Sequence, residues 1–574
     1  MPQFWHMQMF PGEFSRNQEM MEKCARNALK NNVIGLDWGC NIDKLADEEK
    51  KVYNELQNKG FNEFTNEDWD FLRKLKQRGI ELSPSPDMLE NFYRRMRKRD
   101  IVLIRAGKKP IALVEVMSDY FFSTENLGEG CEKENSVWFR HRRKVRILKE
   151  WDENTTESFP GPTQGTLPSP LRNDNPSFRF ILKHWKEYAM KEKIVEVVNL
   201  VKKFKQIILY GPPGSGKTHL AKAVAEEITK EINCEWTISK VDELWKEFVS
   251  QIDNKELETK QGAKFKVSIG NNLTLDVWVK GEKKVNPLTI NREKIENFLE
   301  KCNCNVENAT VGEGESYLWG VSKEFINWIK NQYLSKLIQF HPSYTYEDFI
   351  RGIEVKTENG QPVYQSKNKI FAQMCERAEQ NPNQNFVLII DEINRANLPA
   401  VLGELIYALE YRGEPVDTPY EISGKRTLTV PKNLYIIGTM NTADRSVGHI
   451  DYAIRRRFAF YPIRADKNQI INSKAKELYE KIIEEIFKKE NMSPEFKDKV
   501  EDVKIGHTYF LGDEEEIAYK FVYQVIPLLK EYVQDGILKN EKVIEDAFKN
   551  FFGEVEDWKT LSVEKVKEKL QFQQ

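Results

Sequence analysis

The sequence predicts a multidomain α/β protein: a three-layer module on a doubly wound parallel sheet, with a small α+β barrel before it and a helical domain after it. Three observations support this expectation. The chain has 574 residues, whereas single hydrophobic cores stop growing at roughly 250–300 residues. Three segments are almost wholly apolar, which is typical of parallel strands covered on both faces. A Lys/Glu-rich stretch with helical spacing follows them.

The composition is that of a globular protein. Hydrophobic residues make up 40% of the chain and charged residues 31%, with a net charge of −2, which excludes a disordered class. The sequence shows neither a secretory signal nor an apolar run near the roughly 20 residues of a membrane span. With seven cysteines, it indicates a protein of the reducing cytoplasm with no membrane partner. The close pair Cys302 and Cys304 lacks a second zinc-binding pair, so a structural role is favoured.

Residues 1–151 are expected to form the small α+β domain. Its strand-like runs include "NNVIGLDWG" (31–39), "MRKRDIVLIRAGKKPIALVEVMSDYFF" (96–122) and "VWFRHRRKVRIL" (137–148). Two basic clusters, Arg94 to Arg99 and Arg140 to Arg146, are dense enough to contact phosphates. Two solvated faces are an equally weighted alternative.

The order of these runs resembles EVE/YTH-like domains of the PUA-like class, with Asp100 at the motif's aspartate and Arg99 in place of its usual glycine. The resemblance implies recognition of a modified base that is flipped out of DNA and stacked on aromatic rings. Trp38 is the strongest candidate because it ends a strand beside Gly39; for any one aromatic, filling the barrel core is the favoured alternative. The candidate base or DNA contacts are Trp5, Trp38, Tyr120, Phe121, Trp138, Arg142 and Arg143.

Residues 152–176, "DENTTESFPGPTQGTLPSPLRNDNP", separate this domain from the next. They contain five prolines and two glycines and few large apolar side chains. Such a composition cannot offset the entropy lost on ordering. A flexible linker is therefore expected here.

The apolar run "QIILY" (206–210) leads into "GPPGSGKTHLAKAVAEEI" (211–228), which matches G-x-x-x-x-G-K-[ST] between a strand and a helix. Glycines let the backbone wrap a phosphate, and the helix N-terminus attracts it. Lys217 is expected to reach the β- and γ-phosphates, and Thr218 to ligate Mg²⁺. The predicted nucleotide contacts are Gly211, Pro212, Pro213, Gly214, Ser215, Gly216, Lys217, Thr218 and His219.

Two further apolar strands end in polar groups. "NFVLII" (385–390) runs into Asp391, expected on the Mg²⁺ shell, and Glu392, expected to orient or deprotonate the attacking water. "NLYIIGTM" (433–440) ends at Asn441, which can hold that water. The three arginines at 455–457 exceed the need of one site, but a neighbouring subunit in a ring could use one of them to stabilise the transition state.

Asp391 follows Lys217 by 174 residues, more than two strands of one nucleotide core require. An insertion is expected at about 235–338. Within it "KFKVSIGNNLTLDVWVKGEKK" (264–284) predicts a β-hairpin, and "REKIENFLEKC" and "SKEFINWIKNQYLSKL" predict helices. A partner-contacting surface and a stabilising elaboration are equal alternatives. From residue 466 to 574 the periodicity predicts a helical lid domain.

Together these motifs resemble the McrB family of AAA+ proteins, the nucleotide-hydrolysing subunits of modification-dependent (type IV) restriction systems. The likeness covers about residues 178–574. It rests on "GPPGSGKT", "IIDEINRANLPAVLGELIYALEYRG", "MNTADRS", "DYAIRRRF", "FHPSYTYEDFIRG" (340–352) and "IGHTYF" (505–510). It implies an AAA+ P-loop NTPase core over 177–465.

The resemblance also implies GTP as the preferred nucleotide with Mg²⁺, a hexameric homo-oligomeric ring, modified double-stranded DNA and a McrC-like nuclease partner. Asn441, Asp444 and Arg445 match the loop through which that partner stimulates hydrolysis, and Arg456 and Arg457 look like trans-acting fingers. Asn394 and Arg395 are candidate sensors of nucleotide or neighbour. The motifs themselves bind phosphates and do not separate GTP from ATP.

Two other functions remain open. An AAA+ remodelling ATPase would use its front domain to bind protein or RNA, and a nucleotide-gated binding protein with negligible turnover would not need Glu392. The sequence contains no recognisable nuclease constellation, so cleavage is expected from a partner. Neither N6-methyladenine nor a modified cytosine is favoured as the target.

Overall fold

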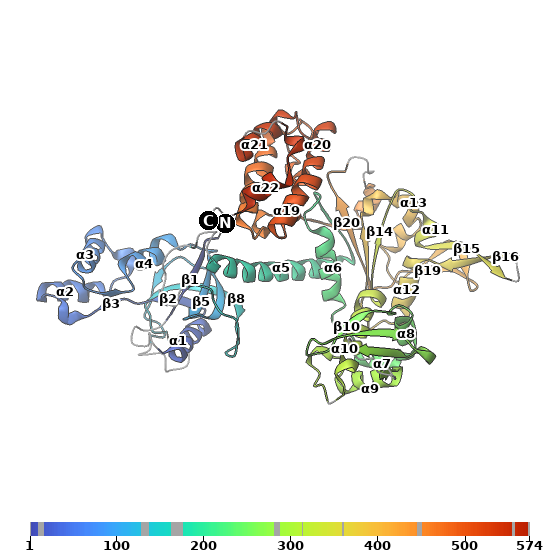
Figure 1. Cartoon of the computed structure of the whole chain (residues 1–574), viewed down its shortest axis with the longest axis horizontal. Coiled ribbons are helices and arrows are strands. Elements are labelled where there is room, and N and C mark those ends of the chain that lie inside the picture. Colours follow the sequence, from blue (N-terminus) through green and yellow to red (C-terminus); the bar gives the residue numbers. More distant parts are fainter. Residues whose placement is uncertain are drawn as a thin grey trace. The chain divides into compact units, whose positions relative to one another are not determined.

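The computed structural model describes residues 2–9, 17–127, 137–161, 171, 176–279, 288–312, 314–358, 361–444, 450–553 and 557–571. The chain divides into two compact units, Met1–Glu192 with Ile471–Lys476 and Lys193–Ile470 with Glu477–Gln574. The long helix α5 (Pro176–Phe204) contains residues of both units (Figure 1). Within the described ranges, no helix combines the length and the apolar character that crossing a bilayer requires.

The first unit is an α+β domain, as expected, around a six-stranded sheet of order β1-β5-β6-β8-β2 with β7 beside β8. β1 pairs parallel to β5, and the other pairs are antiparallel. The strands of this sheet are β1 (Phe4–Met7), β2 (Val33–Leu36), β5 (Ile101–Ala106), β6 (Lys109–Val116), β7 (Phe121–Phe122) and β8 (His141–Glu150). Its helices are α1 (Gln18–Lys30), α2 (Asp47–Leu56), α3 (Asn66–Gln77) and α4 (Pro86–Glu90), and a π-helical turn (Asn91–Arg95) follows α4; β3 (Gly39–Cys40) pairs with β4 (Leu82–Ser83).

The start of the expected linker packs against this domain. Phe159 is fully buried in a cluster that includes Phe4, Trp151 and Phe178, and its N–H donates to the Lys108 carbonyl over 2.7 Å. Residues 152–161 therefore belong to the compact unit rather than to a flexible linker, because a few large aromatic side chains suffice to anchor a polar segment.

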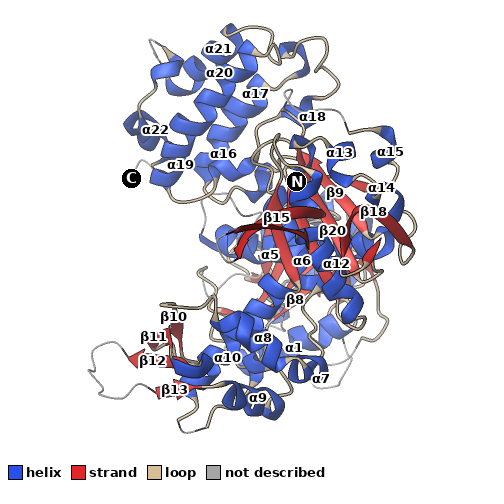
Figure 2. Cartoon of the chain, turned by 90° about the vertical axis from the view of Figure 1, so that its right-hand side faces the viewer, coloured by secondary structure: helices blue, strands red, loops and turns tan. Residues whose placement is uncertain are grey.

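The second unit contains the predicted parallel sheet, of order β14-β17-β20-β9-β21. The three apolar runs are confirmed as central strands. The chain moves from β9 across to β14 and then returns through β17 and β20 to β21. Right-handed crossovers in such an order put helices on both faces of a sheet. Figure 2 draws the strands in red and the helices in blue. The elements are β9 (Gln206–Gly211), α6 (Lys217–Ile228), β14 (Ser335–Gln339), α12 (Ile370–Gln380), β17 (Phe386–Asp391), β20 (Leu434–Asn441) and β21 (Ala459–Pro462).

The insertion between α6 and β14 shares the hydrophobic core of this module. Its predicted hairpin is confirmed by β11 and β12, which pair antiparallel; residues 280–284 of that prediction lie outside the described residues. The helix predicted over 322–337 is partly wrong: it ends in a π-helical turn at Tyr333, and Ser335 begins β14, because pairing with buried β17 overrides local helix propensity. The elements are α7 (Cys234–Ser239), α8 (Val241–Val249), β10 (Glu256–Glu258), β11 (Lys264–Ile269), β12 (Leu275–Val279), β13 (Leu288–Ile290), α9 (Arg292–Lys301) and α10 (Ser316–Trp328).

A disulfide joins Cys234 to Cys304, with Cα atoms 5.5 Å apart. It links α7 to the turn after α9. This bond departs from the expectation of reduced thiols throughout.

Two hairpins and several short helices complete the sheet module. Arg351 ties the hairpins together, since its guanidinium donates to the Thr418 hydroxyl and to the carbonyls of Arg426 and Thr427. These elements are α11 (Tyr346–Phe349), β15 (Arg351–Glu358), β16 (Gln361–Asn368), α13 (Leu398–Leu402), α14 (Leu405–Ala408), β18 (Pro415–Ile422), β19 (Lys425–Thr429) and α15 (Tyr452–Arg455).

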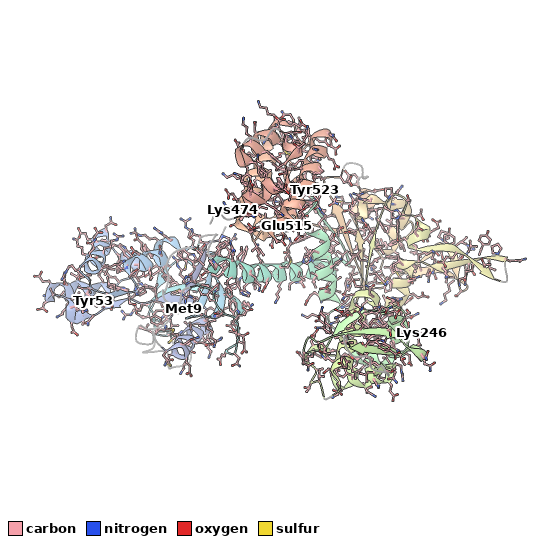
Figure 3. The ribbon with its side chains drawn as sticks, viewed as in Figure 1. Met9, Tyr53, Lys246, Lys474, Glu515 and Tyr523 are labelled. Carbon is pink, nitrogen blue, oxygen red and sulfur yellow. A yellow bond between two sulfur atoms is a disulfide. The ribbon has the colours of Figure 1, made fainter. Side chains whose placement is uncertain are left out.

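The C-terminal region is helical, as expected. Glu515, labelled in Figure 3, pairs with Lys567 over 2.7 Å and so connects α19 to α22. The helices are α16 (Ser473–Leu478), α17 (Glu484–Ile486), α18 (Val500–Val503), α19 (Glu514–Lys520), α20 (Ile526–Gln534), α21 (Lys542–Phe552) and α22 (Val563–Leu570).

Candidate functional site

The turn between β9 and α6 requires its glycines. Gly214 and Gly216 have φ values of 72° and 88°, a left-handed conformation that strains other residues. A Cβ on Gly211 would lie 2.0 Å from the Ile463 carbonyl oxygen. The turn therefore brings the N-terminus of α6 directly to the end of β9.

This turn holds a buried cation. The Lys217 ammonium donates to the carbonyls of Gly211 and Pro212 over 3.0 and 2.8 Å, and burial lowers its pKa to about 8. The Ser215 hydroxyl is buried and has no hydrogen-bond partner among the described residues. His219 is exposed on α6. A buried ammonium beside an unpartnered hydroxyl suits a polyanion such as a triphosphate.

Asp391 and Glu392 form hydrogen bonds with polar side chains of α6 and β20. Thr218 Oγ1 donates to Asp391 Oδ1 over 2.8 Å. Thr439 donates to the same oxygen over 2.5 Å and accepts from the Glu392 N–H over 3.2 Å. Asn441 donates to Glu392 Oε1 over 2.5 Å. Thr439 lies at the carboxyl end of β20, two residues before Asn441, and its contacts with Asp391 and Glu392 add it to the predicted site residues.

Burial raises the pKa of Glu392. A general base needs a pKa closer to neutral than that of an exposed carboxylate. The Glu392 side chain therefore has both the position and the proton affinity to accept a proton from a water at the end of the sheet.

Arg395 connects this carboxylate to the loop after β20. Its Nε lies 3.4 Å from Glu392 Oε2, and its terminal NH2 group lies 2.9 Å from Asp444 Oδ2. The Asn394 amide donates to the Asn441 carbonyl over 3.3 Å. The structure thus brings Glu392, Asn441 and Asp444 together, whereas Arg445 lies outside the described residues.

The "IGHTYF" segment contacts the turn that precedes α6. The N–H groups of Gly506 and Thr508 donate to the carbonyls of Pro213 and Gly214 over 2.9 and 3.0 Å. A Cβ on Gly214 would lie 2.3 Å from the Tyr509 ring. The sequence identified this segment by resemblance but did not place it at the site.

The arginines that end α15 differ in exposure. Arg457 is 11% exposed; it pairs with Glu410 over 2.8 Å and donates to the Ala453 carbonyl over 2.6 Å. Arg456 is 68% exposed and pairs with Glu410 over 3.2 Å, and Arg455 lies over the Phe460 ring. Arg457 is therefore held by contacts within its own chain, whereas Arg455 and Arg456 are exposed. Of the two predicted trans-acting arginines, Arg456 is the more exposed one.

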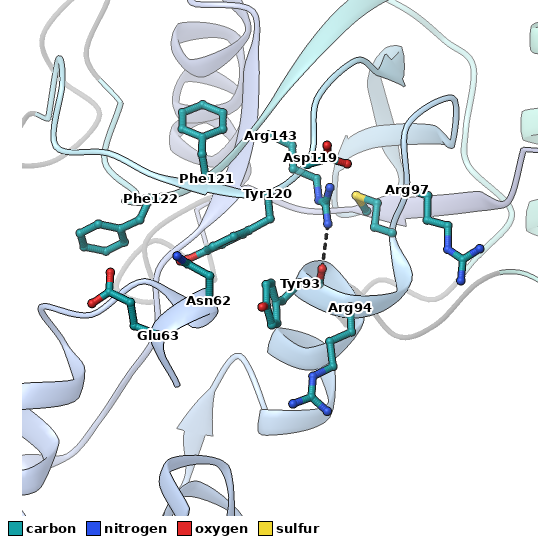
Figure 4. Close-up of a pocket in the computed structure, with 11 residues that line it drawn as sticks. Asn62, Glu63, Tyr93, Arg94, Arg97, Asp119, Tyr120, Phe121, Phe122 and Arg143 are labelled. Atoms are coloured by element: carbon teal, nitrogen blue, oxygen red, sulfur yellow. Dashed lines mark hydrogen bonds between the residues drawn. The ribbon is translucent and has the colours of Figure 1, made fainter. Parts of the chain in front are cut away.

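A pocket of about 530 Å³ opens in the N-terminal domain (Figure 4). The hydroxyl of Tyr120 accepts from the Phe61 N–H and hydrogen-bonds to His141 Nδ1, each over 2.7 Å. Four aromatic side chains, two exposed arginines and three acceptor side chains line it: Tyr93, Tyr120, Phe121, Phe122, Arg94, Arg97, Asn62, Glu63 and Asp119, with Met96 and Arg143.

The structure places some of the candidate aromatic residues in the pocket and others in the core of the domain. Tyr120 and Phe121 line the pocket, whereas Trp5 belongs to the core: it is fully buried and its indole N–H donates to Asp100 over 2.9 Å. Trp38 is 4% exposed and packs edge-on against Tyr53, labelled in Figure 3. Trp138 is half-buried and does not line the pocket.

The expected phosphate contacts Arg142 and Arg143 are buried. Arg142 donates to the carbonyls of Phe139 and Glu125, and Arg143 to those of Phe92, Tyr93 and Ser118. Both are corrections to the prediction, because β8 begins inside the sheet, where a guanidinium must satisfy its donors with carbonyls. The exposed cations come from the other cluster: Arg95, Arg97 and Arg99 form no ion pair within the described ranges.

Family comparisons match separate models to the N-terminal domain, the nucleotide-binding module and the helical lid. Residues 207–268 match "ATPase family associated with various cellular activities (AAA)", residues 310–458 match "AAA domain (dynein-related subfamily)", and residues 483–542 match "McrB, alpha-helical lid domain". Residues 13–168 match "Domain of unknown function (DUF8426)", which does not confirm an EVE-like domain. The fold and the site define an AAA+ P-loop NTPase module with a helical lid.

Two curated relatives show which AAA+ proteins the nucleotide-binding and lid domains are similar to. The chain is 37% identical over 229 residues to the "Type IV methyl-directed restriction enzyme EcoKMcrB subunit" of Escherichia coli K12, covering 36% of this chain and 48% of the relative. It is 28% identical over 173 residues to the "Type II restriction enzyme BsuMI component YdiS" of Bacillus subtilis 168, covering 24% and 50%. The chain thus spans about half the length of these relatives. Its nucleotide-binding and lid domains are those of a McrB-family AAA+ protein.

A solved structure from Cytophaga hutchinsonii ATCC 33406 covers 48% of this chain and 95% of its own at 14% identity, with a TM-score of 0.17. A score this low supports no argument about the fold.

Proposed function

We propose that this protein is the DNA-recognition and motor subunit of a cytoplasmic, modification-dependent restriction complex. It binds modified double-stranded DNA through its N-terminal domain and hydrolyses nucleoside triphosphate, GTP in preference to ATP, in a hexameric ring. A McrC-like partner cuts the DNA. The observation that supports this most is the link from Glu392 through Arg395 to Asp444 of the "MNTADRS" loop. The relatives' names favour restriction over protein remodelling.

The residues fit a magnesium-bound nucleoside triphosphate. Lys217, the unpartnered Ser215 hydroxyl and the glycine-rich turn would hold the phosphates, and Thr218 with Asp391 would hold Mg²⁺. When bound, Mg²⁺ supplies neutralisation of the developing phosphate charge. Glu392 accepts the proton of the attacking water, while the Asn441 amide and Arg395 each fix one of its carboxylate oxygens.

Nucleotide affinity is expected to fall above the pKa of Lys217, which burial lowers to about 8. Bound phosphates favour the ammonium, so binding raises this pKa. Below it the free protein already carries the proton; above it, binding must take a proton up. Affinity should therefore be level from about pH 7 to 8 and fall by up to about tenfold over the next pH unit.

Fluorescent-nucleotide titration across this pH interval measures the effect. Lys217→Met, which cannot titrate, should bind weakly with no such fall. A level profile for the unmodified protein would contradict a buried Lys217 that loses its proton near pH 8.

The pocket of the N-terminal domain is the proposed site for the modified base. Its volume is within the usual range for ligand pockets, and its walls offer the faces of Tyr93, Phe121 and Phe122 for stacking. Arg94 and Arg97, which line the pocket and are exposed, supply phosphate contacts. Arg95 and Arg99 are exposed in the same segment of the chain. Aromatic side chains that can stack on a base, and arginines that can bind the flanking phosphates, together suit one extruded nucleotide.

A binding assay with the full chain at fixed salt tests the proposed base site. It compares matched duplexes that carry N6-methyladenine, 5-methylcytosine, 5-hydroxymethylcytosine or no modification. One modified duplex should bind selectively, and Phe121→Ala should weaken that binding roughly 5- to 100-fold through lost stacking. Trp138→Ala, an aromatic outside the pocket, is the control and should retain selectivity. Equal, salt-sensitive binding to all four duplexes would favour the remodelling alternative.

A further inference from the structure

Glu410 lies between the two arginines that follow α15. A single carboxylate oxygen, Oε2, is 2.8 Å from the Arg457 guanidinium and 3.2 Å from that of Arg456. The two arginines are not equivalent, because Arg457 is largely buried and also donates to the Ala453 carbonyl. The carboxylate is therefore anchored on one side by a fixed guanidinium and faces an exposed one on the other.

The surroundings of Arg456 are those of an interface. Tyr452, four residues earlier and so on the same side of the helix, is 88% exposed. Tyr407 and Tyr411, which flank Glu410 in the chain, are 48% and 44% exposed and stack at 4.5 Å. Exposed tyrosines around an exposed arginine are the composition of protein-protein hot spots.

We propose that Glu410 is a positioning residue that holds Arg456 ready for the nucleotide site of a second copy of this chain. This rests on the proposed function, in which subunits of a ring share their sites. An arginine side chain loses considerable rotamer freedom when it is immobilised, so limiting that freedom before the contact forms lowers the cost of reaching the neighbouring phosphates. Because an exposed ion pair is weak, Glu410 restrains Arg456 without trapping it.

The second copy is the occupant that the charges favour. Arg456 is an exposed cation on this surface, next to the exposed Arg455, and the proposed phosphate site beside Asp391 and Glu392 is the part of a neighbouring chain that needs a cation. A purely internal role is the competing explanation: Glu410 would then only neutralise Arg457, and its loss would affect the subunit that carries it.

Mixed rings of full-length chains distinguish the positioning role of Glu410 from a purely internal one. A donor with Lys217→Ala keeps its arginines but cannot hold nucleotide, and an acceptor with Arg456→Ala keeps its site but lacks the arginine. Neither should hydrolyse nucleotide well alone, and an equimolar mixture should regain activity wherever a donor arginine faces an acceptor site.

Glu410→Gln in the donor should lower the kcat of the mixture about fivefold and leave KM within about twofold, and Glu410→Asp in the donor should restore part of the rate. The same Glu410→Gln in the acceptor, whose Arg456 is already absent, should change neither value. Equal losses from both placements, or no loss from either, would overturn the proposal. Absence of recovery in the original mixture would instead refute the shared site of the proposed function. Melting temperatures of each variant verify folding.

Discussion

Glu392→Gln is expected to lower the hydrolysis rate by about 100- to 10,000-fold, the usual contribution of a general base. Glutamine keeps the shape of the side chain and one carbonyl oxygen for the Asn441 amide, but it cannot accept a proton from water. Lys217 and Thr218, the proposed contacts of the phosphates and Mg²⁺, donate hydrogen bonds to Gly211 and Asp391, which the substitution leaves in place. Nucleotide affinity should therefore be retained or rise slightly, because one negative charge near the phosphates is lost.

Single-turnover hydrolysis of GTP and ATP, measured side by side, gives the rate and the nucleotide preference, and fluorescent-nucleotide titration gives the affinity. Glu379→Gln is a matched control, since Glu379 is an exposed glutamate on α12 of the same module. Unchanged hydrolysis in Glu392→Gln would identify a nucleotide-gated binding protein rather than a motor.

The parallel sheet and its nucleotide-binding turn could be predicted from the sequence because their determinants are local. Gly214 and Gly216 occupy left-handed positions that few other residues tolerate. The strands that carry Asp391 and Asn441 are continuous apolar runs. Because the carboxyl ends of parallel strands lie at one edge of the sheet, polar residues that end such strands lie there too, independently of contacts made elsewhere in the chain.

Contacts between distant segments could not be predicted in this way. Arg142 and Arg143 belong to a dense basic cluster, yet carbonyls of the π-helical turn and of neighbouring loops surround them. The three adjacent arginines at 455–457 look alike in sequence. Arg456 and Arg457 both pair with Glu410, but Arg457 is 11% exposed and also donates to the Ala453 carbonyl, whereas Arg456 is 68% exposed. Charge density reveals which side chains can bind phosphate, whereas burial decides which of them can reach it.

Gly506→Ala is expected to weaken nucleotide binding by at least about tenfold, although residue 506 is not a predicted phosphate ligand. An added Cβ would lie 1.9 Å from the Gly214 carbonyl oxygen and 2.4 Å from the Ser215 nitrogen. Both atoms belong to the backbone of the phosphate-binding turn, so they cannot move aside as a flexible side chain can. Either the turn deforms or the lid segment retreats and gives up the hydrogen bond from the Gly506 N–H to Pro213.

The alanine itself is not strained at this position, because Gly506 has a φ of −75°; the clash is the whole effect. Gly536→Ala is the control within the lid: its φ of 65° adds backbone strain of about 1 kcal/mol, but no atom of the described residues lies within 4 Å of the new Cβ. Gly536→Ala should therefore lower the melting temperature and leave nucleotide affinity unchanged, whereas Gly506→Ala should lower affinity in titrations of folded protein. Affinity equal to that of the unmodified protein in Gly506→Ala would show that the lid does not shape the phosphate-binding turn.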